Sequence, residues 1–238
     1  MTWNTEEQDT QRNEVLTDFF GGHQEEELTS EWLERLREFE GLMMKYNSAI
    51  REVTTKLEVL NDELSFSSRR NPIESIQARI KRPYSIARKL RRLGQPVTVE
   101  SISANLNDVA GVRVICPFLD DIYAISDMLL KQDDIQLVAK KDYIQQPKPN
   151  GYRSLHLIIE IPIFFSTGKE MTRVEIQIRT VAMNFWASLE HQIRYKNDVV
   201  VQPEIVEKLS ACADRIAETD WEMMQLRDQI AAQGKGHR

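Results

Sequence analysis

The chain is short of cysteine and of long apolar runs. Only Cys116 and Cys212 occur among its 238 residues, and Cys116 lies in the apolar segment VRVICPF, so a disulfide framework is not expected and a reducing compartment fits. No apolar run approaches the roughly 18 residues that span a bilayer, and the first residues are acidic, unlike a signal sequence. The sequence therefore predicts a cytoplasmic protein without a membrane partner.

Glycine is also scarce, with nine residues, and the absence of a glycine-rich Walker loop excludes a P-loop enzyme. The chain still contains 41% hydrophobic and 29% charged residues, which is ordinary for a globular protein that buries a core. Its net charge of −6 hides a separation of charge. Residues 1–40 carry twelve Asp or Glu against three Arg, whereas residues 69–92 carry nine Lys or Arg against Glu74 alone. Such a basic block favours a local polyanion site over a general nucleic-acid surface, and no DNA partner is expected.

The chain begins with an acidic segment, residues 1–28, that we expect to be partly disordered, with a short helix ending near Phe20. A long helix follows, capped by Thr29 or Ser30. Its apolar residues recur at alternating spacings of three and four: Leu36, Phe39, Met43, Tyr46, Ile50, Val53, Leu57, Leu60 and Leu64. This seam needs a partner, which is either its own domain or, in part, another subunit.

Strand and helix periods alternate after residue 73. The predicted strands lie at about 75–81, 109–116 and 135–140 and in two segments joined by a turn at 166–168. The predicted helices lie at about 84–93, 120–131, 181–196 and 203–232. This order predicts an α/β fold, a mixed sheet flanked by helices, in a single domain over residues 29–238 with its motifs at 73–196.

Polar side chains lie on two of these strands, in the segments RSLHLIIEI and VEIQIRT. A period of two places Ser154 and His156 on one face of the first strand, and Glu175, Gln177 and Arg179 on one face of the second. Such a face is either simply solvated or lines a cleft. Because an Asn-Gly-Tyr turn and the basic block accompany the two strands, we favour a cleft that binds a nucleotide.

The basic block joins a strand to the start of a helix. Arg79 and Lys81 share one face of the strand, and Pro83 suits the first position of the helix. Ser85 and Lys89, four residues apart, add a hydroxyl and an ammonium beside the unpaired N–H groups of that first turn. This set suits a triphosphate, and a solvated basic helix face is the alternative.

Asp108 precedes an apolar strand, and a carboxylate at a strand end is a common Mg²⁺ ligand. Arg113 alternates with apolar neighbours, so its guanidinium is expected on the site side, where it can stack on a base. The alternatives are a capping role for Asp108 and a surface ion pair for Arg113.

The loop KDYIQQPKPNGYRSLH pairs basic with aromatic residues. Tyr152 follows an Asn-Gly turn, where its ring can stack on a second base while Lys148 meets phosphates. Asn184 both donates and accepts hydrogen bonds and therefore suits the edge of a purine. The neighbouring apolar residues Phe185, Trp186 and Leu189 are expected in the core.

The ordered segments RIKRPYSIARK, NDVAGVRVIC, DDIY, KDYIQQPKPNGYRSLH and VEIQIRT followed by FWASLEH resemble the synthetase domain of the RelA/SpoT family, most closely its small, single-domain alarmone synthetases. The resemblance implies a nucleotidyltransferase-like fold. It also implies transfer of the β,γ-pyrophosphate of ATP to the ribose 3′-hydroxyl of GDP or GTP, which gives AMP and ppGpp or pppGpp for the stringent response.

The resemblance assigns residues to the donor nucleotide. Arg79 and Arg113 would sandwich the adenine of ATP. The residues implied at its phosphates are Lys81, Ser85 and Lys89.

The resemblance likewise assigns residues to the metal and to the acceptor. Asp108 would bind magnesium, and Glu175 would act as the general base on the 3′-hydroxyl, as a further metal ligand, or both. The residues implied at GDP or GTP are Tyr152 on the guanine ring, Asn184 at its edge, and Lys148 and His156 at the phosphates.

Long members of the family carry an upstream hydrolase with a metal-binding His-Asp pair. No histidine of this chain precedes an aspartate, which predicts synthesis without hydrolysis. The small members assemble as homotetramers, so the resemblance implies a homotetramer held by the heptad helix and the C-terminal helices.

Two other functions compete with this one. A non-catalytic nucleotide- or RNA-binding regulator would use the same groove without turnover, and an intact Asp108 and Glu175 argue against it. A nucleotidyltransferase of similar fold would be expected to carry paired acidic metal ligands such as D-x-D, and the strand that follows Asp108 carries none.

Overall fold

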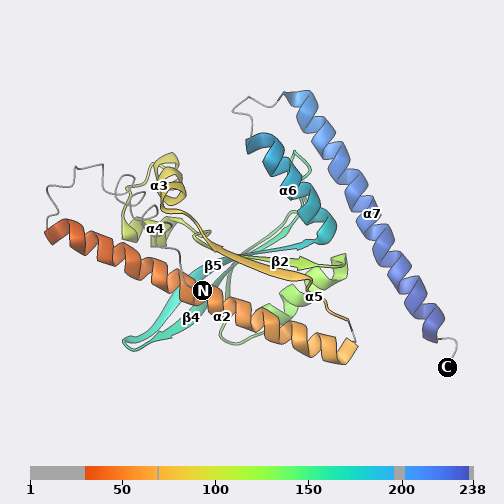
Figure 1. Cartoon of the computed structure of the whole chain (residues 1–238), viewed down its shortest axis with the longest axis horizontal. Helices are drawn as coiled ribbons and strands as arrows, with labels where there is room; N and C mark the ends of the chain where they lie inside the picture. The colour runs from red at the N-terminus through yellow and green to blue at the C-terminus, as the bar shows by residue number, and fades with distance from the viewer. Residues whose placement is uncertain (1–29, 69, 196–201, 236–238) are drawn as a thin grey trace, which may run out of the picture. The chain divides into compact units, whose positions relative to one another are not determined.

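The computed structural model describes residues 30–68, 70–195 and 202–235, so the predicted acidic segment and its short helix lie outside the described residues. The elements, most of which are labelled in Figure 1, are α2 (Ser30–Ser68), β1 (Ser75–Ile80), α3 (Pro83–Arg92), α4 (Val99–Asn105), β2 (Ala110–Cys116), α5 (Leu119–Leu130), β3 (Gln136–Asp142), β4 (Leu155–Phe165), β5 (Gly168–Thr180), α6 (Val181–Tyr195) and α7 (Pro203–Lys235). Among these helices, none is long and apolar enough to cross a membrane.

The strands form one mixed sheet of five in the order β1-β2-β5-β4-β3, flanked by helices. β3 pairs antiparallel with β4. β1 runs antiparallel to β2, because Glu74 N–H donates to the Ile115 carbonyl and Lys81 N–H donates to the Val109 carbonyl, each at 2.8 Å. The α/β class and the mixed sheet predicted from the sequence are confirmed.

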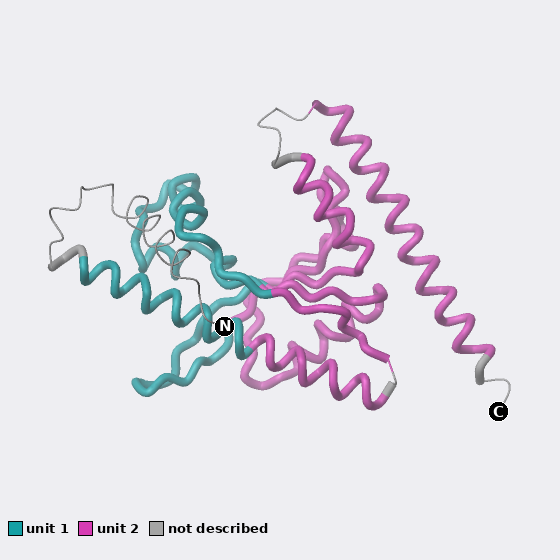
Figure 2. The backbone as a smooth tube through the Cα atoms, in the orientation of Figure 1, with its two compact units in different colours: residues 1–52, 78–111, 161–175 teal, residues 53–77, 112–160, 176–238 magenta. Residues whose placement is uncertain are grey.

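The chain divides into two compact units, teal and magenta in Figure 2. The first comprises residues 1–52, 78–111 and 161–175, and the second comprises residues 53–77, 112–160 and 176–238. Several elements, including α2 and β5, run from one unit into the other without a break. The single synthetase domain over residues 29–238 stays a prediction.

The heptad seam of α2 is largely buried, which supports packing within its own chain. Its buried members are Leu36, Phe39, Tyr46, Ile50, Val53, Leu57 and Leu60, and Met43 and Leu64 are half-buried. In the second unit Lys56 also holds the helix to the turn before β3, since its Nζ lies 2.9 Å from Gln132 Oε1 and 3.0 Å from Asp134 Oδ1.

The two polar-faced strands differ in how far they are covered. On β5 the predicted alternation is confirmed, because Val174, Ile176 and Ile178 are fully buried while Glu175 and Gln177 are half-buried.

On β4 the side chains from Leu155 to Ile159 are all buried, and His156 is only 8% exposed. Ser154, just before the strand, is fully buried. The polar side of β4 is therefore not a solvated face at this point.

Sequence patterns do not predict α4. Its start signal is present, since Thr98 Oγ1 accepts the N–H of Ser101 at 3.2 Å and Glu100 lies in the first turn. The helix has only seven residues, which is too short for a helical period to stand out from a strand.

Candidate nucleotide-binding site

Two lysines predicted to bind the donor phosphates and the predicted magnesium ligand meet in the first unit. Lys81, just after β1, places its Nζ 2.5 Å from Asp108 Oδ2, and Lys89 on α3 places its Nζ 2.7 Å from Asp108 Oδ1. The second contact has the distance of an ion pair without the alignment of a hydrogen bond. All three side chains are between 20% and 26% exposed, so a ligand in solution can reach them.

The two lysines set the charge state of Asp108. Burial alone would raise the pKa of this carboxyl, but the hydrogen bond from Lys81 and the positive charges of Lys81 and Lys89 outweigh it and hold the pKa below its ordinary value. Asp108 is therefore ionised at neutral pH, and the cluster keeps a net positive charge. The alternative of a helix or turn cap for Asp108 is not what its contacts show.

The first turn of α3 adds further anion-binding groups. Pro83 is its first residue, as predicted, and the preceding Arg82 makes no side-chain cap. No acidic residue lies in this turn, so its N–H groups and the positive end of the helix dipole stay uncompensated by side chains. Ser85 is half-buried in the same turn, and Arg79 is exposed on β1.

Arg113 and Glu175 lie at the predicted strand positions. Arg113 is half-buried on β2 between the buried Val112 and Val114, and it belongs to the second unit. Glu175 is half-buried on β5 and belongs to the first unit, as Asp108 does.

A tight turn presents Tyr152 in the second unit. The N–H of Gly151 donates to the Lys148 carbonyl at 2.8 Å, with Pro149 at the second position of the turn. Gly151 has φ of +88°, a conformation that glycine adopts readily. Asn150 Oδ1 accepts the N–H of Tyr152 at 3.3 Å, so both turn residues predicted from the sequence fix the tyrosine.

Cationic and aromatic groups surround the Tyr152 side chain. Lys148 Nζ lies 4.7 Å from the centroid of its ring and 4.6 Å from that of Tyr143. The hydroxyl of Tyr152 lies 2.8 Å from His156 Nε2, and the rings of Tyr143 and Tyr152 meet edge to face with centroids 6.0 Å apart. Lys148, Tyr152 and His156, each predicted separately, therefore form one cluster.

Arg179 is a member of this cluster to which the sequence assigns no role. Its Nη2 donates to the Tyr152 hydroxyl at 2.6 Å and to Gln177 Oε1 at 2.8 Å, and its guanidinium carbon lies 5.0 Å from the Tyr152 ring centroid. Arg179 is only 5% exposed, and a buried guanidinium requires such partners. Its place on the polar face of β5 is the one signal that the sequence offers.

Asn184, on α6, is half-buried and carries an unusual atom. Its Oδ1 is buried without a hydrogen-bond partner among the described residues. An unpaired buried acceptor costs about 1–3 kcal/mol, so a donor from a ligand would be stabilising there. Trp186 is buried as predicted, but the prediction that Phe185 and Leu189 are core is wrong, since they are 59% and 42% exposed.

A basic cluster around a carboxylate and a cation-lined aromatic cluster, both built on a mixed α/β sheet, define a nucleotide-binding protein. Residues 78–199 match the family described as the region found in RelA / SpoT proteins, and the chain belongs to this family.

Named relatives extend the match over most of the chain. The protein is 39% identical over 195 residues to the GTP pyrophosphokinase YwaC of Bacillus subtilis strain 168, which covers 82% of this chain and 93% of YwaC. It is 33% identical over 195 residues to the GTP pyrophosphokinase YjbM of the same organism, covering 82% and 90%. The crystal structure of small alarmone synthetase 1 from Bacillus subtilis bound to its product pppGpp matches with a TM-score of 0.74 at 33% identity, covering 82% of this chain and 98% of that one.

Proposed function

We propose that the protein is a GTP pyrophosphokinase, which transfers the β,γ-pyrophosphate of ATP to the ribose 3′-hydroxyl of GDP or GTP and gives AMP and ppGpp or pppGpp. It synthesises these nucleotides and does not hydrolyse them. The observation that carries the proposal is the Lys81–Asp108–Lys89 cluster, in a chain 39% identical to a GTP pyrophosphokinase over 82% of its length.

The donor side works by an exchange of partners. In the structure both ammonium groups neutralise Asp108. The phosphates of ATP would accept from Lys81 and Lys89, with the hydroxyl of Ser85 and the first-turn N–H groups of α3 as further donors. The carboxylate of Asp108 would then be left for a cation. We assign the adenine to Arg79 and Arg113.

The residues present fit Mg²⁺. This ion is usually held by one or two carboxylates together with substrate phosphates, and the described residues contain no cluster of three His, Cys, Asp or Glu. Asp108 would hold it, with Glu175 as a second ligand or as the base that takes the proton of the 3′-hydroxyl. When bound, Mg²⁺ supplies positive charge that offsets the charge developing on the transferred group.

The acceptor site would recognise guanine by stacking on its ring and by hydrogen bonds to its edge. The ring of Tyr152 would stack on the base, and the buried Oδ1 of Asn184 would accept from the N–H donors that guanine carries on its edge. Lys148 and His156 would contact the phosphates of GDP or GTP, as ammonium and imidazole groups do.

Replacing Tyr152 with Ala is expected to raise the KM for GDP and GTP by about 10- to 100-fold, because base–aromatic stacking contributes about 1–3 kcal/mol. Tyr152→Phe keeps the ring but loses the hydroxyl that contacts His156 and Arg179, so a rise of less than about tenfold is expected. Steady-state kinetics at saturating ATP measure both. An equal rise in the KM for ATP would contradict the assignment of Tyr152 to the acceptor.

The reaction itself is tested with γ-labelled ATP, magnesium and GDP or GTP. Label on a guanosine product, with AMP formed in equal amount, supports pyrophosphate transfer. Free labelled pyrophosphate would instead indicate a nucleotidyltransferase, and nucleotide binding without turnover would indicate a regulator. ppGpp added to the same mixture is expected to remain intact, since the proposed enzyme does not hydrolyse it.

We also infer a cytoplasmic homotetramer. Cys116 and Cys212 are both free thiols, which fits a reducing compartment. Large apolar side chains are exposed along the last two helices: Phe185, Leu189, Ile193, Trp221, Met223, Leu226 and Ile230. An open groove of about 360 Å³ lies between α6 and α7. Exposed apolar side chains beside an open groove are typical of an interface, and closed symmetry is the usual form of a homo-oligomer.

Introducing charge on this surface with the double change Leu226→Glu and Ile230→Glu is expected to convert the tetramer to smaller species. Multi-angle light scattering after gel filtration gives the mass. Phe164→Glu is the matched control, since Phe164 is 76% exposed on β4 and away from these helices in the sequence. A wild-type mass of one protomer would refute the tetramer.

A further inference from the structure

The helix α7 packs directly on the turn that presents Tyr152. A Cβ built on Gly151 would lie 2.5 Å from Ala213 Cβ and 3.0 Å from Ser210 Cα, both on α7. Arg153, two residues after Gly151, donates from its Nη2 to Asp214 Oδ1 at 2.8 Å. The turn and the helix therefore approach each other closely at this point, and only glycine fits between them.

The same helix reaches the end of β5 through a buried hydrogen bond. Thr180, which is fully buried, donates its hydroxyl to Asp220 of α7, which is 6% exposed. The hydroxyl oxygen of Thr180 also accepts the N–H of Met183 at 3.1 Å, in the first turn of α6. One hydroxyl thus ties together a strand, the start of α6 and α7.

Thr180 lies between two side chains of the acceptor cluster. The preceding residue, Arg179, holds the Tyr152 hydroxyl at 2.6 Å. The residue after Met183 is Asn184, whose buried Oδ1 has no hydrogen-bond partner among the described residues. A shift of Thr180 would therefore move both the group that orients Tyr152 and the group assigned to the guanine edge.

Packing between α6 and α7 reinforces the two contacts. Trp186 on α6 donates its ring N–H to the Leu209 carbonyl on α7 at 3.1 Å. Trp186, Ala187 and Ala213 form a small buried cluster, and Tyr152 packs against it. The face of Tyr152 turned away from solvent therefore rests on residues that α7 holds in place.

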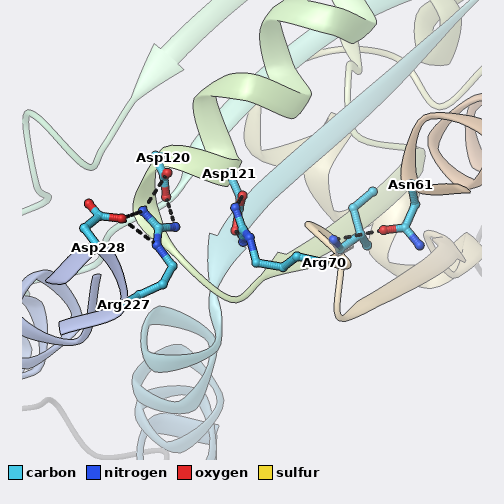
Figure 3. A network of polar contacts seen from close by, with 7 residues as sticks. Asn61, Arg70, Asp120, Asp121, Arg227 and Asp228 are labelled. Atoms are coloured by element: carbon cyan, nitrogen blue, oxygen red, sulfur yellow. Dashed lines mark hydrogen bonds and ion pairs between the residues drawn. The ribbon is translucent and has the colours of Figure 1, made fainter. Parts of the chain in front are cut away.

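The far end of α7 is fixed separately, at the start of α5. Figure 3 shows Arg227 directed at Asp120, whose two oxygens it contacts at 2.9 Å each. The Arg227 guanidinium also lies 4.5 Å from the centroid of the Phe118 ring. This clamp is on the opposite side of Asp220 from Ala213 in the sequence of α7, and it joins α7 to Asp120 and Phe118.

We propose that α7 is a positioning element of the acceptor site, and that Thr180, Asp220 and Ala213 are the residues through which it sets Tyr152 and Asn184. The inference rests on the proposed function, which assigns guanine nucleotide to these two side chains. None of the three positioning residues is required to touch the substrate. Their loss should weaken recognition of GDP and GTP and leave recognition of ATP unchanged.

The test compares variants that differ by one hydrogen-bonding atom. Thr180→Val preserves the shape and removes the hydroxyl, and it is expected to raise the KM for GDP and GTP about tenfold with the KM for ATP changed less than about twofold. Thr180→Ser keeps the hydroxyl and is expected to restore the wild-type KM. Asp220→Ala is expected to raise the KM for GDP and GTP as Thr180→Val does. Asp220→Asn keeps an acceptor for the Thr180 hydroxyl and is expected to retain the wild-type KM.

Arg227→Met is the matched control on the same helix. It removes the clamp at α5 and is expected to lower the melting temperature slightly while the KM for GDP stays within about twofold. Titration calorimetry with GDP provides a readout independent of turnover, and Asp220→Ala replaces Thr180→Val if the latter does not fold. An unchanged KM for GDP in both variants, or a parallel rise for ATP, overturns the inference. If the wild type binds GDP but transfers no pyrophosphate, the proposed function fails, and calorimetry still decides the role of α7.

Discussion

Replacing Glu175 with Gln is expected to lower kcat by about a thousandfold while the KM values for ATP and GDP stay within about threefold. General-base catalysis contributes roughly 10²–10⁴-fold, and glutamine has the shape of glutamate but cannot take the proton of the 3′-hydroxyl. The neighbours Val174 and Ile176 are fully buried and hold this part of β5 in place. The change therefore removes a charge and a proton acceptor without a packing defect.

Glu170→Gln is the matched control for this variant. Glu170 lies on the same strand and in the same unit, but it is 39% exposed and pairs with Lys45 at the surface, a contact worth about 1 kcal/mol at most. Its turnover is expected to equal that of the wild type. Near-normal turnover of Glu175→Gln would remove Glu175 from the mechanism. A partial recovery at high magnesium would assign it to the metal, whereas loss of the rising limb of the pH–rate profile would assign it to the proton.

The strands of this protein were predictable because their periods are local. On β5 the three apolar residues Val174, Ile176 and Ile178 alternate with polar ones, and this pattern alone places Glu175 on the opposite face. The start of α3 was predictable for a similar reason, since Pro83 marks the first helical position. What a residue does to its own backbone can be inferred from the sequence.

Contacts between distant segments were not predictable. Helical spacing identified an apolar face of α6, but whether α7 covers Phe185 and Leu189 depends on the path of the chain after α6, and both are exposed. Arg179 illustrates the same limit for a charged residue. Its burial depends on Tyr152, which is 27 residues away in sequence and comes into reach only through the pairing of strands. Local sequence patterns do not indicate which distant residues form such pairs.

The Lys81–Asp108–Lys89 contact combines both cases. Local patterns predict Lys81 and Lys89 at phosphates and Asp108 at magnesium, and the structure shows that the three residues touch. The sequence did not indicate that the lysines neutralise the carboxylate. That pairing matters for ATP binding. Because Asp108 supplies a counter-charge to Lys81 and Lys89, the three ionised side chains stay together when no ligand is bound.

Asp108→Asn is expected to lower kcat/KM by at least a thousandfold, because a cation that neutralises the transferred group contributes several kcal/mol and Asp108 is its proposed protein ligand. Binding of ATP without metal should respond in the opposite direction. Removing the carboxylate raises the net charge of the cluster by one and releases Lys81 and Lys89 for phosphate, so metal-free ATP is expected to bind as tightly as to wild type or more tightly. Fluorescence titration with a labelled ATP analogue in EDTA measures this binding.

Stability at low pH provides a second test of the same variant. The folded-state pKa of Asp108 is depressed, so its ion pairs stabilise the wild type above the ordinary carboxyl pKa and this contribution is lost as the pH falls through the folded value. Asp108→Asn should be less stable than wild type at pH 7, with the difference shrinking as the solution is acidified.

Asp121→Asn is the control, because Asp121 is equally an ion-paired aspartate, bound by Arg70 at 2.5 and 2.6 Å, but lies in the second unit. It should lose stability while keeping its turnover. If Asp108→Asn instead binds metal-free ATP more weakly, the lysines do not serve the phosphates, and the exchange of partners on which the donor site depends does not occur.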